Sequence, residues 1–220
     1  MTEQLDGPRR PPANGNRPKQ LVVLLHGYGA DGDDLIGLAD YWSALLPDAA
    51  FVSPHAPFAC GAAAWGREWF PLVQRDQASI AAGIALAAPI LDSFLDAELD
   101  RSGVRPEALA LVGFSQGAMM ALDIGPARPG PIAGILSYSG LIARPVRPAY
   151  PGRPPVFLFH GSEDQLIPPT ALGRAEQALA EAGLPVEAHL QRALGHGIDQ
   201  EGLKRGGRFL ANVLAPAVNG

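Results

Sequence analysis

Cysteine is almost absent from this sequence of 220 residues, because Cys60 is its single example. One cysteine excludes an internal disulfide and cannot by itself form a metal site. Clusters of basic residues are also missing, and with a net charge of −5 nucleic acid is not expected as a partner. Residues 1–19 lack the apolar stretch of a secretory signal, and we expect a flexible tail there. These absences favour a cytoplasmic protein without structural disulfides.

The sequence also lacks a long apolar run of the kind that spans a membrane. The stretch Ala81–Leu91 is apolar, but it is short, contains Pro89 and continues directly into Asp92 and Asp96. This pattern predicts a buried helix rather than a transmembrane segment. We therefore expect no stable membrane insertion.

Short apolar runs alternate with helical segments along the chain, which is typical of a parallel sheet with helices on both faces. The apolar runs predict strands at Leu21–Leu25, Phe51–Ser53, Leu109–Gly113, Ile132–Ser137, Val156–His160 and Val186–Leu190. The intervening segments predict helices at Asp34–Leu46, Ser79–Asp100, Gln116–Ile124, Thr170–Ala182 and Gln200–Leu214. Neither an internal repeat nor a domain boundary is visible, so residues 20–220 are predicted to form a single α/β domain.

The motif Gly113-Phe114-Ser115-Gln116-Gly117 stands between a predicted strand and a predicted helix. A Gly-x-Ser-x-Gly at such a junction is typical of a nucleophile elbow, in which a sharp turn exposes the serine hydroxyl at the edge of the sheet. Small residues are needed because the turn brings strand and helix too close for larger side chains. An ordinary serine in a tight turn is the alternative. The position of the motif favours Ser115 as a nucleophile.

A serine hydroxyl needs a base within hydrogen-bond reach and a third group that orients the base. Asp164 follows the predicted strand Val156–His160, and His196 lies between two glycines after the predicted strand Val186–Leu190. The order Ser, Asp, His is that of an α/β hydrolase. We predict Ser115 as nucleophile, His196 as general base and then acid, and Asp164 as the residue that orients the imidazole. Glu163 is a competing carboxylate that the order along the chain does not exclude.

The other four histidines receive different interpretations. His26 and His160 each end a predicted strand before a glycine, and we expect them to support the loops around the site. His55 also follows a strand and is a candidate for the border of the pocket, whereas His189 lies within a strand and is expected to face the surface.

The transition state of acyl transfer carries negative charge on the former carbonyl oxygen, which backbone N–H groups must meet. One donor in a hydrolase of this kind belongs to the residue after the nucleophile, here Gln116. The loop His26-Gly27-Tyr28-Gly29 follows the first predicted strand, and its glycines allow close approach of the backbone. Tyr28 is therefore the predicted second donor.

Two other patterns suggest a dinucleotide site and a metal site, but neither pattern is complete enough to predict one. The segment from Gly27 to Gly32 spells G-x-G-x-x-G, yet the second predicted strand ends without the carboxylate that a dinucleotide-binding fold needs. Asp31, Asp33 and Asp34 suggest a metal hydrolase, but acids at this place are better interpreted as helix caps. We predict neither a cofactor nor a metal ion.

The chain resembles the bacterial phospholipase/carboxylesterase family, the small α/β hydrolases related to acyl-protein thioesterases. The resemblance extends from about residue 21 to 200 and is carried by Leu25–Asp31, Pro54–Pro57, Trp69-Phe70, Gly113–Gly117, His160-Gly161 with Asp164, and Gly195–Gly197. It implies a cofactor-independent esterase of the α/β-hydrolase fold, without a large lid and with a Ser-His-Asp triad. It also places the oxyanion donors at Tyr28 and Gln116.

Two positions depart from the family pattern, since Ala118 and Tyr28 replace a common glycine and a common leucine. The Tyr28 ring is expected to narrow the pocket. We also hypothesise that Trp65, Trp69 and Phe70 wall the substrate pocket, with a place in the core as the alternative.

Three functions remain open at this stage. The first is a carboxylesterase for small-molecule esters with short to medium acyl chains or aryl groups, acting through an acyl-enzyme. The second is an acyl-thioesterase or lysophospholipase on longer chains. The third is a non-catalytic binding protein on a hydrolase scaffold, which retention of every triad and oxyanion residue disfavours. The resemblance makes a homodimer plausible.

Overall fold

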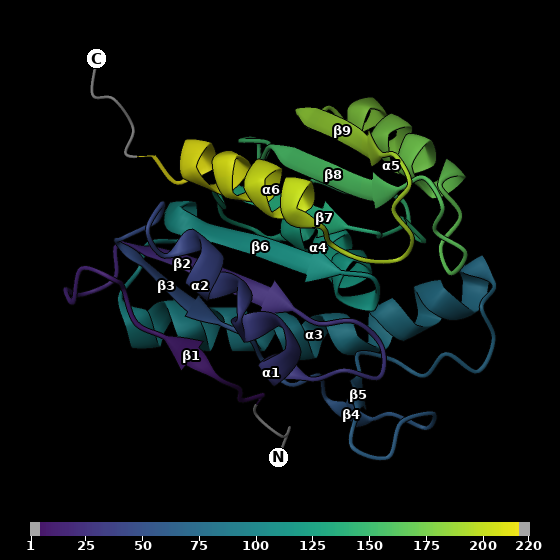
Figure 1. The fold of residues 1–220 in the computed structure, drawn as a ribbon, viewed down its shortest axis with the longest axis horizontal. Helices are drawn as coiled ribbons and strands as arrows, with labels where there is room; N and C mark the ends of the chain where they lie inside the picture. Colours follow the sequence, from purple (N-terminus) through teal and green to yellow (C-terminus); the bar gives the residue numbers. More distant parts are fainter. Residues whose placement is uncertain (1–4, 216–220) are drawn as a thin grey trace.

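The centre of the molecule is a twisted sheet with helices on both faces, drawn in Figure 1. In the computed structural model, which describes residues 5–215, this sheet has seven strands in the order β1-β3-β2-β6-β7-β8-β9. The strands are β1 (Arg9–Arg10), β2 (Gln20–Leu25), β3 (Ala49–Val52), β6 (Leu109–Phe114), β7 (Gly134–Tyr138), β8 (Val156–Gly161) and β9 (Val186–Gln191). All pair in parallel except β1, which is antiparallel to β3.

The predicted α/β-hydrolase fold is confirmed, and the six predicted strands are present, with no end shifted by more than two residues. The central strands are almost continuously apolar and buried, because helices cover both of their faces. Parallel pairing places the carboxyl ends of β2, β6, β8 and β9 at one edge of the sheet. The loops that leave these four ends carry every residue predicted for catalysis.

Two layers of helices bury the two faces of the sheet. One core joins the sheet to α3 (Gln77–Ser102), α4 (Gln116–Ala127) and α5 (Thr170–Glu181). The other core joins the opposite face to α1 (Gly32–Ile36), α2 (Leu38–Trp42) and α6 (Gln200–Val213). Figure 1 shows α6 and α2 crossing in front of the sheet while α3 runs behind it. A short 3₁₀ helix, η1 (Pro106–Ala108), leads into β6.

Helix α3 contains the apolar stretch that the sequence predicts as a buried helix. Within residues 5–215 it is the one helix long and apolar enough to cross a membrane by length and composition, with a mean hydropathy of 1.7 over its best window. Core helices of globular proteins pass the same test. One face of α3 packs into the core through residues such as Ile84, Leu91 and Leu95, but only 33% of the window is buried, so the helix is less buried than predicted.

Three local predictions need correction. The helix predicted over Asp34–Leu46 is two short helices, α1 and α2, interrupted at Gly37. A small hairpin of β4 (Phe58–Ala59) and β5 (Arg67–Glu68) was not predicted, because two-residue strands have no readable periodicity. The third correction concerns the N-terminal segment.

Residues 5–19 do not behave as the flexible tail expected from their composition. Arg9 pairs with Val52 in the sheet, and its guanidinium lies 2.6 Å from the buried carboxylate of Glu98 on α3. Asn14 also donates its backbone N–H to the Pro47 carbonyl. An edge strand and an ion pair therefore attach this segment to the domain, while residues 1–4 lie outside the described part.

Candidate active site

The turn between β6 and α4 has the geometry of a nucleophile elbow. Ser115 adopts φ 53° and ψ −114°, a left-handed conformation that is unusual for a residue with a side chain. A Cβ at Gly113 would lie 2.4 Å from the Gly117 carbonyl oxygen, and one at Gly117 would lie 2.0 Å from the Leu25 carbonyl oxygen. Both glycines are thus required by close backbone approach, as the motif predicts.

His196 and Asp164 are hydrogen-bonded to each other. Nδ1 of His196 lies 2.7 Å from Oδ2 of Asp164, and the Asp164 side chain is fully buried. With the proton on Nδ1, the imidazole donates to the carboxylate and keeps Nε2 as an acceptor. The competing carboxylate of Glu163 is exposed and makes no such contact. The structure therefore pairs His196 with Asp164 and not with Glu163.

The loop around Asp164 holds its carboxylate in place. Oδ1 accepts hydrogen bonds of 2.9 Å from the backbone N–H groups of Leu166 and Ile167. His160 supports the same loop, because its Nε2 lies 2.9 Å from the Ile167 carbonyl oxygen. Burial alone would raise the pKa of Asp164, but the hydrogen bonds from His196 and from these backbone groups lower it below its usual value. The carboxylate is ionised at neutral pH.

One pocket of ≈ 280 Å³ brings Ser115 and His196 together. Tyr28 and Gln116 also line it, so the four predicted residues from three strand-end loops meet at one cavity. The Phe114 ring packs against the His196 imidazole with 4.9 Å between ring centroids. The remaining walls are mainly apolar and come from Leu72, Ile80, Met119, Leu141, Leu166, Ile167 and Pro168; among residues 5–215, Arg75 adds a charged side chain to this lining.

The loop after β2 approaches the elbow closely. A Cβ at Gly27 would lie 3.1 Å from the Phe114 ring and 3.5 Å from Cβ of Ser115. Among the hydrogen bonds of residues 5–215, the backbone N–H groups of Tyr28 and Gln116 have no acceptor from the protein. Two unused donors beside a strained serine are what an oxyanion intermediate requires.

A hydrogen-bonded bridge ties these two loops together. The buried Gln116 side chain accepts from the Trp69 backbone N–H at 2.8 Å and donates to the Phe70 carbonyl at 2.7 Å. The Trp69 indole N–H in turn donates to the His26 carbonyl at 2.9 Å. The segment 69–70 therefore links α4, which carries one proposed donor, to the loop that carries the other.

His26 fixes the backbone beside the Tyr28 loop. Its Nε2 accepts from the Ala56 backbone N–H at 3.0 Å, so the ring proton is on Nδ1, which lies 2.8 Å from the Gly27 carbonyl oxygen. Burial lowers the pKa of His26 to about 4. The predicted supporting role of His26 is consistent with these contacts.

The aromatic residues proposed as a pocket wall are not where the sequence analysis put them. Trp69 and Phe70 are fully buried in the core, and Trp65 is 94% exposed beside a different hollow, between Pro57 and Arg67. None of the three lines the pocket at Ser115. The core alternative therefore holds for Trp69 and Phe70.

Tyr28 lines the pocket, as expected, and interaction with the Cys60 side chain raises the pKa of its phenol to about 12. Two histidines differ from expectation. His189 is half-buried, since its ring stacks on Phe159 at 5.3 Å. His55 borders the hollow of Trp65 rather than the pocket at Ser115.

Asp31, Asp33 and His55 place one ligand atom each within 4.8 Å of one another. Two of these side chains already hold the start of α1. Asp31 accepts from the Asp33 backbone N–H, and Nδ1 of His55 accepts from that of Gly32. The arrangement fits the predicted helix cap.

Comparison with known proteins gives the following matches. The family model described as Phospholipase/Carboxylesterase matches residues 12–214. "Esterase YpfH" of Escherichia coli (strain K12) is 31% identical over 186 residues, which cover 84% of this chain and 79% of that protein. "Acyl-protein thioesterase 1" of Gibberella zeae is 29% identical over 214 residues, covering 89% and 91% of the two chains.

Solved structures agree with these matches. The crystal structure of "esterase PE8" superposes with a TM-score of 0.91 at 41% identity, covering 96% of this chain and 100% of that one. A carboxylesterase of Bacillus cereus shares the fold with a TM-score of 0.78 at 17% identity, covering 95% and 94% of the two chains.

Proposed function

The chain belongs to the phospholipase/carboxylesterase family, and from this premise we propose that it is a serine carboxylesterase. Its substrates are small-molecule esters with short to medium acyl chains or aryl groups. The observation that carries the proposal is the pairing of His196, which lines the same pocket as Ser115, with the buried carboxylate of Asp164. Hydrolysis of carboxylic esters is the activity that the family as a whole supports.

The first half of the reaction forms an acyl-enzyme. His196 Nε2 takes the proton of the Ser115 hydroxyl as Oγ attacks the carbonyl carbon of the ester. The carbonyl oxygen becomes negatively charged, and the backbone N–H groups of Tyr28 and Gln116 donate hydrogen bonds to it. When the carbon–oxygen bond to the alcohol breaks, the protonated His196 returns its proton to the leaving oxygen. Ser115 now carries the acyl group.

The second half repeats these steps with water. His196 removes a proton from a water molecule, whose oxygen attacks the acyl carbon. The bond between that carbon and Oγ of Ser115 then breaks as His196 returns the proton to Oγ. The buried carboxylate of Asp164 stabilises the imidazolium that forms in each half. A carboxylic acid leaves, and the enzyme returns to its first state.

The shape of the pocket favours short to medium acyl chains. A volume of ≈ 280 Å³ with mainly apolar walls is at the lower limit of about 300 Å³ that small-molecule sites usually have. The alternative substrate class is a long-chain acyl thioester or lysophospholipid, and a relative named acyl-protein thioesterase 1 favours it. A cytoplasmic location and a homodimer remain predictions from the sequence.

Hydrolysis of p-nitrophenyl esters with acyl chains from two to sixteen carbons tests the proposal. We expect activity with a maximum at short to medium chains, and a loss of at least about 10⁴-fold in kcat in the variant Ser115→Ala. A maximum at the longest chains would favour the lipid-like class. A folded protein without activity on any ester or thioester would favour the non-catalytic alternative.

A further inference from the structure

Met119 lies between the pocket of Ser115 and a second, smaller hollow. It lines both of them, and it stands one helical turn after Ser115 on α4, where its backbone N–H donates to the Ser115 carbonyl at 3.1 Å. The side chain is almost fully buried, with 5% of its surface exposed. Its position is therefore close to where an acyl group attached to Ser115 begins.

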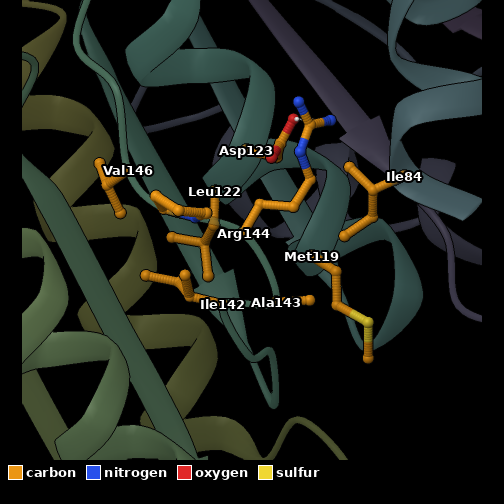
Figure 2. Close-up of a pocket in the computed structure, with 9 residues that line it drawn as sticks. Ile84, Met119, Leu122, Asp123, Ile142, Ala143, Arg144 and Val146 are labelled. Carbon is orange, nitrogen blue, oxygen red and sulfur yellow. Dashed lines mark hydrogen bonds and ion pairs between the residues drawn. The ribbon is translucent and has the colours of Figure 1, made fainter. Parts of the chain in front are cut away.

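The second hollow is lined by apolar side chains together with one ion pair. Its residues come from α3, α4 and the loop after β7, namely Ile84, Met119, Leu122, Asp123 and residues 142–146. Figure 2 shows Ile84 and Met119 on one side and Val146 on the other, with the Arg144 guanidinium beside the Asp123 carboxylate. That ion pair has an N–O distance of 3.3 Å.

The walls of the two hollows are continuous. Ile80 lines the first and Ile84 the second, and these residues are one turn apart on α3. Leu141 lines the first, and Ile142 follows it in the second. Among residues 5–215, Met119 is the one residue that belongs to both linings. The open space in the second hollow is ≈ 10 Å³, about enough for one water molecule.

We propose that Met119 is the specificity-determining residue that ends the acyl pocket, and that the second hollow is an acyl subsite which this side chain keeps closed. The proposal rests on the proposed esterase function and names what limits its substrates. Methionine suits such a barrier because it is unbranched and fills irregular gaps. Shortening the side chain would join the ≈ 280 Å³ pocket to the hollow up to the Asp123–Arg144 pair.

The experiment compares the ratio of kcat/KM for p-nitrophenyl decanoate to that for the butyrate in wild type, Met119→Ala and Met119→Val. We expect the ratio to rise by about fourfold for each methylene that gains a place, which corresponds to ~0.8 kcal/mol of burial. The rise is smaller in Met119→Val, and hexadecanoate remains a poor substrate because the Asp123–Arg144 ion pair adds a charged wall to the second hollow. Met120→Leu is the control, since Met120 is buried in the same helix but lines neither hollow.

A second series keeps the acetyl group and lengthens the alcohol. If Met119→Ala changes the preference for the alcohol and leaves the acyl preference as in wild type, the proposal is wrong. It is equally wrong if Met120→Leu shifts the acyl ratio as much as Met119→Ala does. Melting temperatures of all variants show which of them are folded, and Met119→Val keeps the test available where the alanine variant is not.

Binding separates this proposal from the proposed function. In the Ser115→Ala background, we expect Met119→Ala to tighten the Kd of decanoate, measured by calorimetry, and to leave that of butyrate within about twofold. If decanoate binds more tightly in this background, but the chain with Ser115 intact hydrolyses no ester, the subsite is supported and the esterase is refuted. Ester hydrolysis with an unchanged chain-length ratio and unchanged decanoate binding would refute the subsite and leave the esterase.

Discussion

The edge of the sheet that carries Ser115, Asp164 and His196 and the wall of the pocket beside it are built in different ways. The edge is fixed by backbone contacts and buried hydrogen bonds, such as those from the Leu166 and Ile167 N–H groups to Asp164. The wall consists mainly of apolar side chains from α3, α4 and three loops. The edge thus depends on a few specific atoms, whereas the wall depends on volume and shape.

This difference predicts where substitutions act. Changes at the edge should lower kcat by large factors, because the geometry of charged and hydrogen-bonded groups decides the rate. Changes in the wall should alter the choice of substrate by smaller factors, because burial of apolar surface is additive and tolerant of shape. The following predictions are ordered from the largest expected effect to the smallest.

Asp164→Asn should give the largest loss among the residues that touch no substrate. An amide in place of the carboxylate favours the wrong imidazole tautomer, and we expect kcat to fall by about 10⁴-fold. Glu163→Gln is the matched control, because Glu163 is adjacent but exposed, and its activity should stay within about twofold of wild type. A larger loss in Glu163→Gln than in Asp164→Asn, measured by steady-state kinetics, would refute the assignment.

Gln116→Leu should lower kcat by roughly 10- to 100-fold through displacement of the two proposed oxyanion donors. The substitution keeps the backbone N–H of residue 116 but removes the bonds to Trp69 and Phe70. Trp69→Phe removes only the bond to the His26 carbonyl and should have a smaller effect. The measurement is kcat and KM with a short ester, together with the melting temperature. A fall in melting temperature with unchanged kcat would mean that the bridge stabilises the fold without positioning the donors.

The contribution of the edge to the free energy of unfolding should also depend more strongly on acid pH than the contribution of the wall. His26 has a pKa of about 4 in the folded protein against 6.5 when exposed, so the unfolded chain binds the proton first as the pH falls. Stability from this depressed pKa is present above about pH 6.5 and is lost between pH 6.5 and 4, by roughly 3 kcal/mol.

Urea unfolding at pH 7.5 and 4 checks this prediction in wild type, His26→Leu and Ile84→Val. We expect the loss of unfolding free energy on acidification to shrink in His26→Leu. Ile84→Val, a change in the apolar core beside the second hollow, should lower stability about equally at both pH values. An unchanged pH dependence in His26→Leu would assign the acid sensitivity to other groups.

Trp65→Ala should have the smallest effect, within about twofold in kcat/KM for every chain length. This side chain is 94% exposed and lines a hollow other than that of Ser115. A shifted chain-length profile in the p-nitrophenyl series would restore the original idea that Trp65 walls the substrate pocket.

The same contrast explains what could be predicted from the sequence. The elbow requires glycine at positions 113 and 117 because a Cβ at either would meet backbone atoms. The motif can therefore be recognised from the identity of its residues. Asp164 and His196 follow parallel strands, whose carboxyl ends meet at one edge, and their positions follow from the order of the elements.

The pocket wall left no comparable signal. Met119 and Met120 look alike in the sequence, yet only Met119 faces the pocket, which depends on how α4 is rotated against the sheet. Leu166 could have been found by the strand-end argument, because it follows Asp164 in the same loop. The burial of Trp69 in the core could not be predicted from the sequence, because an aromatic residue beside a motif can face either the core or the site.

The prediction of a flexible N-terminal tail was wrong over residues 5–19 for a different physical reason. Its proline- and arginine-rich composition is typical of a tail, but Arg9 finds a buried partner in Glu98, which is 89 positions away. Composition cannot report a contact of that range.

The most direct test of the account is covalent labelling with a fluorophosphonate, followed by mass spectrometry of the peptide that contains residues 113–117. Reaction with such a reagent needs an activated serine and a general base, but neither an ester substrate nor a particular acyl length. We predict one label per chain, on Ser115, at a rate that falls by at least about 10³-fold in His196→Ala. Labelling at another residue, or an equal rate in His196→Ala, would contradict the claim that these strand-end loops assemble a catalytic triad.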